Sequence, residues 1–203
     1  MNLAQIFPTI VFREHIGRAL SPTEHRAIDN ITENLNHNKL NLISGDSYIF
    51  KNQPGLGDIK AFCLDCVNRY IQEVYKPKYD VRPYITQSWL NVSSKGQSHH
   101  RHNHANSFLS GVFYINADPN SDKIWFHNDV YRQIQITAAT YDALNSSSWW
   151  FPVNTGEVIL FPSHLTHDIE TVTADSPRVS IAFNTFLKGV LGTASESTEL
   201  VLT

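Results

Sequence analysis

The chain has 203 residues, 41% of them hydrophobic, and its 16 basic and 19 acidic side chains give a formal charge of −3. This length supports one substantial core, and Lys and Arg form no patch suited to a phosphate backbone, so we expect a single domain and no nucleic-acid partner. No apolar run approaches the roughly 18 to 20 residues that cross a bilayer, and residues 1–16 lack the basic start and cleavage site of a signal peptide. We therefore expect a soluble cytoplasmic protein.

The first elements along the chain are predicted to be a strand and a helix. Residues 5–16 combine β-branched and aromatic side chains, a composition typical of a strand. Ser21, Pro22 and Glu24 then indicate the start of a helix, because serine is a favoured N-cap, proline fits the first turn and the glutamate completes a capping box. We expect this helix and the next to form a helical support over roughly residues 20–76.

A second helix is predicted to follow a polar connection over residues 36–56. Apolar side chains recur with helical spacing through residues 59–74, and Asp58 is placed to cap the helix. Cys63 and Cys66 form a Cys-x-x-Cys pair, a spacing found in redox and zinc sites. Both cysteines fall inside the apolar stripe and the chain has no others, so we expect two buried, inert thiols.

Short strands are predicted for the rest of the chain, separated by clusters of Gly, Pro, Asn, Asp and Ser. They are residues 84–92, 107–116, 123–128, 132–140, 147–153, 156–163, 168–174 and 178–186. Strands of this number and spacing predict a mainly-β sandwich or barrel. We expect a jelly roll over roughly residues 84–188, with the two N-terminal helices packed on one of its sheets.

Histidines are crowded immediately before one of these strands. Four of the ten histidines lie within six residues: His99, His100, His102 and His104. Two ligands one residue apart at a strand end, joined by His167 from a neighbouring strand, can occupy one face of a metal ion and leave the other face open. Open positions allow catalysis, so we expect a catalytic metal site on His102, His104 and His167. We expect His99 and His100 to lie in a mobile loop.

Arg178 begins a strand that continues with apolar residues. Its charge would be buried there, which is tolerable only if an anion or a carboxylate pairs with it. Ser180 lies two residues further on and therefore on the same face of the strand. By the same alternation Ser110, Val112 and Tyr114 share a face of the earlier strand. A structural salt bridge is the alternative interpretation of Arg178.

These residues lie in segments that resemble the 2-oxoglutarate and Fe(II)-dependent oxygenases, and most closely a family of mostly uncharacterised bacterial and phage members. The segments are "IFPTIVF", "SWLNV", "HNHANSFLSGVFYI", "GEVILFPSHLTH" and "RVSIAFN". The resemblance implies a double-stranded β-helix, which is a cupin-like jelly roll, with Fe(II) and 2-oxoglutarate bound between its two sheets. It also implies the cytoplasm of a bacterium or of a phage-infected cell.

The resemblance assigns the iron to His102, His104 and His167. Most members of the superfamily carry aspartate at the position of His104, and this chain has no acidic residue between Asp80 and Asp118. Two interpretations stay open: His104 is itself a ligand in a neutral three-histidine site, or two histidines and water hold the iron. We favour three histidines, a set that lacks the usual negative charge.

A competing metal hypothesis uses His127 and Asp129, which form a literal His-x-Asp. This pair is closer in sequence to His167 than His102 is, and it follows a strand instead of preceding one. Since His-x-Asp at a strand end is also a common turn sequence, we do not expect it to bind the metal. His164 is expected to face solvent or the rim of the site.

The co-substrate is assigned by the resemblance to Arg178, which would bind the distal carboxylate of 2-oxoglutarate, with Ser180 as a hydroxyl donor. Tyr114 is placed near the same carboxylate by similarity to the prolyl hydroxylases. The implied enzyme is a dioxygenase that hydroxylates a substrate and releases succinate and CO2. The substrate is left open between a small molecule and a protein side chain, and a homodimer is left open too.

Two other function classes are kept. One is a three-histidine non-haem iron dioxygenase that does not use 2-oxoglutarate. The other is a non-catalytic jelly-roll module whose histidines hold a structural metal, which would be closed and four-coordinate.

Overall fold

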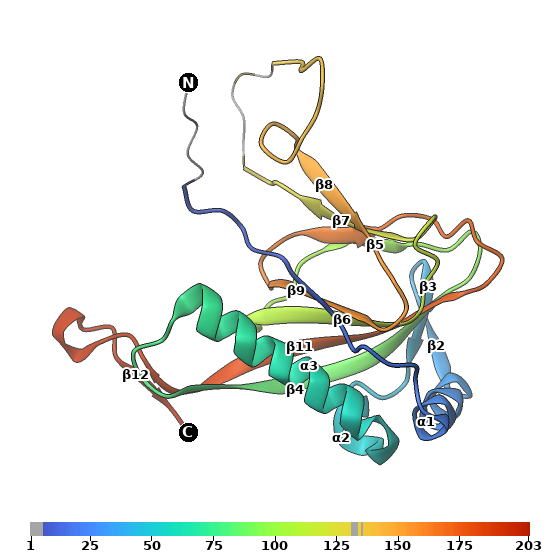
Figure 1. The fold of residues 1–203 in the computed structure, drawn as a ribbon, viewed down its shortest axis with the longest axis horizontal. Helices are drawn as coiled ribbons and strands as arrows, with labels where there is room; N and C mark the ends of the chain where they lie inside the picture. The colour runs from blue at the N-terminus through green and yellow to red at the C-terminus, as the bar shows by residue number, and fades with distance from the viewer. Residues whose placement is uncertain (1–5, 131–133, 135) are drawn as a thin grey trace.

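The computed structural model describes residues 6–130, 134 and 136–203 (Figure 1). The helical elements are α1 (Pro22–Thr32), α2 (Ile49–Asn52), a 3₁₀ turn (Pro54–Leu56), α3 (Gly57–Tyr70), a π-helical turn (Ile71–Tyr75) and a second 3₁₀ turn (Ala194–Glu196). The strands are β1 (Phe12–His15), β2 (Leu35–Asn38), β3 (Asn41–Ser44), β4 (Val81–Ser93), β5 (His99–His102), β6 (Leu109–Asn116), β7 (Lys123–His127), β8 (Ser148–Pro152), β9 (Glu157–Pro162), β10 (His167–Ile169), β11 (Arg178–Leu191) and β12 (Leu200–Leu202).

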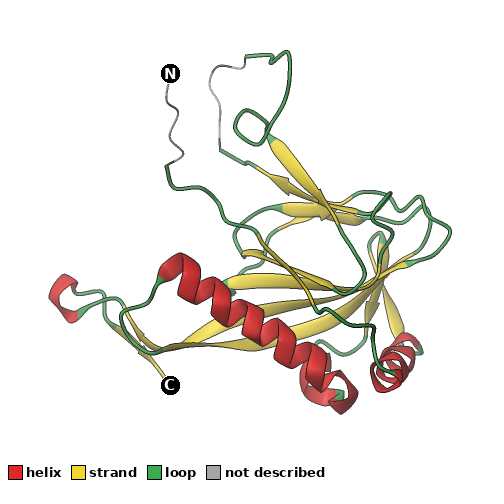
Figure 2. Ribbon diagram, viewed as in Figure 1, coloured by secondary structure: helices red, strands yellow, loops and turns green. Residues whose placement is uncertain are grey.

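The strands form two antiparallel sheets. The large sheet has the order β1-β9-β6-β11-β4-β3-β2, with β12 paired to β11, and the small sheet has the order β5-β10-β7-β8. The helices cover the outer face of the large sheet, while the small sheet lies on its other face (Figures 1 and 2). This mainly-β jelly roll confirms the predicted fold class. In the described part of the chain, no helix combines the length and apolar character needed to cross a membrane.

The strand β6 shows why the large sheet is buried on both faces. Its residues Leu109 and Phe113 pack into the core under the helices, while Val112 and Tyr114 pack into the second core between the two sheets. Alternate residues of a strand point to opposite faces, so both sets must be accommodated. The predicted shared face of Val112 and Tyr114 is confirmed, and it points toward the small sheet.

Gly111 permits the closest packing of β6 against its neighbours. A Cβ atom at this position would lie 2.2 Å from Cζ of Phe183 and 2.7 Å from Cδ2 of Leu160. We expect Gly111→Ala to lower the free energy of unfolding by about 1–3 kcal/mol, the usual cost of overpacking a core. Urea denaturation would measure this, with Gly57→Ala as the matched control, since nothing lies within 4 Å of a Cβ there. Equal losses in both variants would contradict the expectation.

The N-terminal helix begins as predicted. The side chain of Ser21 accepts a hydrogen bond from the backbone N–H of Glu24 at 3.2 Å, and the Glu24 carboxylate accepts one from the backbone N–H of Ser21 at 2.6 Å. The predicted capping box is therefore confirmed. Arg18 adds an ion pair to Glu24 at 2.6 Å.

The second helix is present, but its predicted cap is wrong. The 3₁₀ turn over Pro54–Leu56 runs directly into α3, and the backbone N–H of Gly57 donates to the carbonyl of Pro54. This bond takes the place of a side-chain cap, so Asp58 lies in the first turn instead. The polar connection expected over residues 36–56 also contains the β2–β3 hairpin.

The two cysteines are buried as predicted. Cys63 and Cys66 are both 0% exposed on α3. Burial raises the pKa of the Cys66 thiol to about 12 and that of Cys63 well above its ordinary value. Both thiols are therefore protonated and act as small apolar groups.

Two strand predictions are corrected. Of the predicted strand 132–140, residues 132, 133 and 135 lie outside the described residues, and residues 136–140 form no strand. The side chains of Ile134 and Ile136 are 79% and 85% exposed, so the apolar residues of this segment do not pack against a sheet. The strand predicted over residues 168–174 is only His167–Ile169, because Val172 bonds to the backbone of Gly96 and Gln97 instead.

Candidate metal centre and carboxylate site

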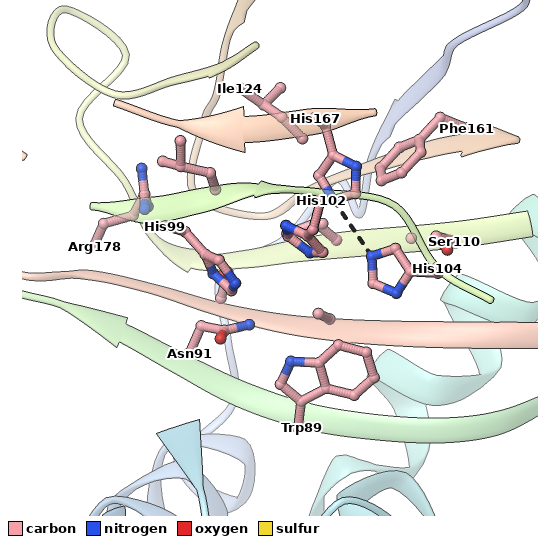
Figure 3. Close-up of a pocket in the computed structure, with 15 residues that line it drawn as sticks. Trp89, Asn91, His99, His102, His104, Ser110, Ile124, Phe161, His167 and Arg178 are labelled. Atoms are coloured by element: carbon pink, nitrogen blue, oxygen red, sulfur yellow. Dashed lines mark hydrogen bonds between the residues drawn. The ribbon is translucent and has the colours of Figure 1, made fainter. Parts of the chain in front are cut away.

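Three imidazoles meet at one edge of the small sheet. His102 ends β5 and faces His167, its register partner at the start of β10, while His104 follows β5 by two residues. One ring nitrogen of each lies within 4.8 Å of the other two, and Nε2 of His104 is 3.4 Å from Nε2 of His167 (Figure 3). Two nitrogens bound to one cation at about 2.1 Å are separated by about 3.0–3.4 Å at ordinary bond angles. The residues predicted as metal ligands are therefore brought together at a spacing that suits a shared ion.

Backbone carbonyls orient two of these rings. Nδ1 of His102 lies 2.7 Å from the carbonyl oxygen of His100, and Nδ1 of His167 lies 3.0 Å from that of Leu165. A carbonyl can only accept, so each Nδ1 carries the proton and each Nε2 presents a lone pair. This is the usual arrangement around histidines that bind a metal ion.

Burial keeps the three imidazoles neutral. It lowers the pKa of His104 to about 4, with a further contribution from the nearby His102, and it lowers the pKa of His167 well below its ordinary value. Burial also lowers the pKa of His102. A metal ion would therefore displace no proton from these rings at neutral pH.

The indole of Trp89 packs against the ring of His104. It stacks on His104 with ring centroids 5.9 Å apart and an interplanar angle of 29°, and the backbone N–H of His104 donates to the carbonyl of Ser163 at 2.9 Å. His104 follows β5 in a loop, and these two contacts fix its position beside the strand residues.

A buried cation, Arg178, lines the same cavity as the three imidazoles. Arg178 is 3% exposed, and its only direct partner in the described part of the chain is Oγ of Ser93, at a long 3.4 Å from Nη2. Its Nη1 and the hydroxyl of Tyr114 are both buried without a hydrogen-bond partner among the described residues. The structural salt bridge considered for Arg178 is thus not formed with any carboxylate of those residues. A buried guanidinium with an unused donor is a fitting partner for a carboxylate.

The large sheet sets the surroundings of Arg178. Ser180 pairs in register with Tyr114 on β6 and with Asn91 on β4. Burial raises the pKa of Tyr114, so its hydroxyl stays protonated as a donor, and burial lowers the pKa of Arg178 without removing its charge.

The cavity lies between the two sheets and connects the imidazoles with Arg178. It is lined by Trp89, Asn91, His99, His102, His104, Ser110, Gly111, Val112, Ile124, Phe161, His167, Ile169, Arg178, Ser180 and Ala182 (Figure 3). Tyr114 packs in one cluster with the lining residues Val112, Ile124 and Phe161, and Asn184 accepts a hydrogen bond from Ser110 at 3.0 Å. The small sheet thus provides the imidazoles and the large sheet provides the guanidinium.

The predicted loop placement of His99 and His100 is wrong, because both residues lie on β5. The ring of His99 stacks on that of His102 with centroids 4.7 Å apart and an interplanar angle of 15°. It lines the cavity between His102 and Arg178 (Figure 3). His100 is on the same strand, outside this lining.

The competing His-x-Asp pair is not at the site. Nε2 of His127 lies 2.7 Å from the carboxylate of Asp168, and Asp129 pairs with Arg101. Neither belongs to the groups of the described residues that could share a metal ion. His164 is exposed, as predicted.

Comparisons with known proteins agree with this geometry. Residues 87–184 match the family described as "Putative 2OG-Fe(II) oxygenase", and no curated protein matches the chain. A prolyl hydroxylase from Trichoplax adhaerens, solved with a peptide fragment, has a TM-score of 0.58 at 12% identity over 87% of this chain and 82% of that chain. A prolyl-4-hydroxylase from Pseudomonas putida has a TM-score of 0.54 at 14% identity over 87% and 92%.

A third similar structure is HygX from Streptomyces hygroscopicus with nickel and 2-oxoglutarate bound, with a TM-score of 0.58 at 10% identity over 87% of this chain and 82% of that chain. At these identities the structures establish the shared jelly roll, while the matched segment contains the strands that carry most of the site. Through residues 87–184 the chain is therefore similar to the family of 2OG-Fe(II) oxygenases that this description names.

Proposed function

We propose that the chain is an Fe(II) and 2-oxoglutarate-dependent dioxygenase in which His102, His104 and His167 bind the iron. The observation that carries the proposal is the pairing of a neutral imidazole triad with a buried, incompletely bonded guanidinium across one cavity. A dicarboxylate that binds a metal ion with one end needs a cation for the other. The family match supports this choice of cofactor and co-substrate.

Arg178 is proposed to bind the distal carboxylate of 2-oxoglutarate, with Ser180 and Tyr114 as hydroxyl donors. The unused Nη1 of Arg178 and the unused hydroxyl of Tyr114 give two donors for that carboxylate. The apolar side chains of Ile124 and Ile169 line the same cavity and exclude water from it. When bound, Fe(II) and 2-oxoglutarate would supply the oxidation, in which a substrate is hydroxylated and succinate and CO2 are released.

The three-histidine set has an electrostatic consequence. With aspartate at the position of His104 the ligands would carry one negative charge, whereas three neutral imidazoles carry none. The site therefore depends more on the charge of the co-substrate to balance a divalent cation. We expect the metal ion and 2-oxoglutarate to bind with positive coupling, each raising the affinity for the other.

The substrate is proposed to be a small molecule or a protein side chain. Structures of similar fold include a prolyl hydroxylase in complex with a peptide fragment and HygX with hygromycin B bound. Both substrate classes are therefore compatible with this jelly roll.

Anaerobic addition of Fe(II) and 2-oxoglutarate tests the proposal. We expect a visible metal-to-ligand charge-transfer band from the wild type, and its loss in His104→Ala and His167→Ala. Losing a group that only orients a metal ligand weakens metal binding by up to about 100-fold. Removing the ligand itself should therefore weaken iron binding by at least about 100-fold. His127→Ala is the matched control and should keep the band, because His127 pairs with Asp168 away from the triad.

The outcomes separate the three functions. A wild type without the band would contradict the proposal, and so would a band that survives in His104→Ala at limiting iron. Oxygen-dependent substrate oxidation without succinate would favour the three-histidine dioxygenase that needs no 2-oxoglutarate. A four-coordinate metal ion bound without a water ligand would favour a structural site.

A further inference from the structure

The histidine cluster on β5 extends beyond the proposed iron ligands because the strand contains a bulge. His102 pairs with His167 and His99 pairs with Ile169, so β5 advances by three residues where β10 advances by two. In a regular strand, residues three apart point to opposite faces. One extra residue breaks this alternation and lets the rings of His99 and His102 stack.

The bulge produces a second group of three imidazoles. One ring nitrogen each of His99, His100 and His102 lies within 4.8 Å of the other two. The ring of His100 has its centroid 5.0 Å from those of both other residues. Its Nδ1 is buried and has no hydrogen-bond partner among the described residues. Three such nitrogens suit a divalent ion of intermediate softness, such as Fe(II), Co(II), Ni(II) or Zn(II).

Both groups depend on the same nitrogen of His102. Its Nδ1 is held by the carbonyl oxygen of His100 at 2.7 Å, so Nε2 is the atom left for a metal ion in either group. One lone pair binds one cation, and the two positions therefore exclude each other. A single ion can occupy one position or the other.

The second group is less buried than the triad, and we expect it to bind a metal ion more weakly. His99 and His100 are half-buried, whereas His167 of the triad is 4% exposed. Lys39 lies close enough to act electrostatically on His100 and His102, and Arg178 acts on His99. These cations disfavour a resident divalent ion, but a weak position is suited to transient occupation.

We propose that His99, His100 and His102 form a capture position for the divalent ion, which passes to the triad of His102, His104 and His167 with His102 as the shared ligand. The inference rests on the proposed function only in taking the triad as the final position of the ion. It assigns a role to the two histidines of the cluster that the proposed chemistry does not use.

Cobalt binding to the untagged full-length chain tests the inference. The His104→Ala/His167→Ala variant removes the final position, and we expect it still to bind one Co(II) per chain, more weakly than the wild type. Adding His99→Ala and His100→Ala should abolish this remaining binding. Adding His25→Ala and His37→Ala, which remove two exposed histidines on α1 and β2, should leave it intact.

Loading kinetics give a second measurement in a chain that keeps the triad. His99→Ala/His100→Ala retains the carbonyl that orients His102, so we expect one Co(II) per chain at equilibrium but a loading rate several times slower than that of the wild type. Unchanged loading, or Co(II) binding in the His104→Ala/His167→Ala background that does not need His99 and His100, would overturn the inference. A chain that behaves as expected with Co(II) but shows no band with Fe(II) and 2-oxoglutarate would defeat the proposed function and leave the capture position standing.

Discussion

Replacing Arg178 by methionine is expected to prevent 2-oxoglutarate binding while making the chain without co-substrate more stable. The guanidinium is 3% exposed and hydrogen-bonded only to Ser93 among the described residues. Asp122 and Glu170 act on it electrostatically but form no ion pair with it, so the folded protein keeps this charge away from water without a direct carboxylate partner. Replacing buried charges by an apolar side chain of similar volume is often stabilising by up to about 4 kcal/mol. The loss of a desolvated partner for a carboxylate costs about 2–5 kcal/mol of binding, which is about 30-fold to several thousand-fold in Kd.

Two measurements check this pair of effects. Calorimetric titration of the metal-loaded protein with 2-oxoglutarate gives Kd, and urea denaturation of the metal-free protein gives the free energy of unfolding. Ser180→Ala should weaken binding by about 10-fold to 150-fold, since one hydrogen bond to a charged group contributes about 1.5–3 kcal/mol. Arg82→Met, at an arginine whose side chain is 73% exposed, should change neither quantity. Wild-type affinity in Arg178→Met would refute the assigned role, and a clear loss of stability would show that the charge is compensated.

The sequence was sufficient for the parts of the site that depend on local pattern. Alternation along a strand placed Ser180 beside Arg178 and Tyr114 on the inner face of β6. The positions of His102 before β6 and of His167 after β9 were visible as changes in composition, whereas the strand β5 was not predicted. In each case the relevant spacing is two residues on one strand, or a strand boundary, so no knowledge of the partner strand was needed.

The incorrect predictions concern features that depend on pairing between strands distant in the sequence. His99 is brought onto His102 by a bulge, and a bulge is a property of the pairing between β5 and β10 that neither strand reveals alone. The alternating residues of segment 132–140 satisfy a local strand pattern, yet the sheet offers no face for Ile136. The short polar strands β2 and β3 lacked the usual composition and are held by pairing with each other and with β4. Local pattern sets a tendency, and long-range pairing decides the outcome.

Acidification is expected to destabilise the metal-free chain through its buried histidines. Burial lowers the pKa of His104 to about 4 and that of His99 to about 3, and it lowers the pKa of His167 well below its ordinary value. In the unfolded chain all three take up protons near pH 6.5. Between pH 6.5 and these lower values the unfolded state binds more protons than the folded state, so the free energy of unfolding falls as the pH falls. Above pH 6.5 the effect is absent.

The size of the effect follows from the pKa gaps. One pKa unit corresponds to about 1.4 kcal/mol, and with allowance for solvent around the half-buried His99 and His104 we expect a combined loss on the order of 3–6 kcal/mol between pH 7 and pH 4. Urea denaturation in the presence of a chelator, at half-unit steps over this range, would measure it. His104→Ala should flatten the curve between pH 6.5 and pH 4, whereas the exposed His25→Ala should not. A free energy of unfolding that stays constant from pH 7 to pH 5 would show that these rings are already solvated in the folded protein, and so would not be held neutral for a metal ion.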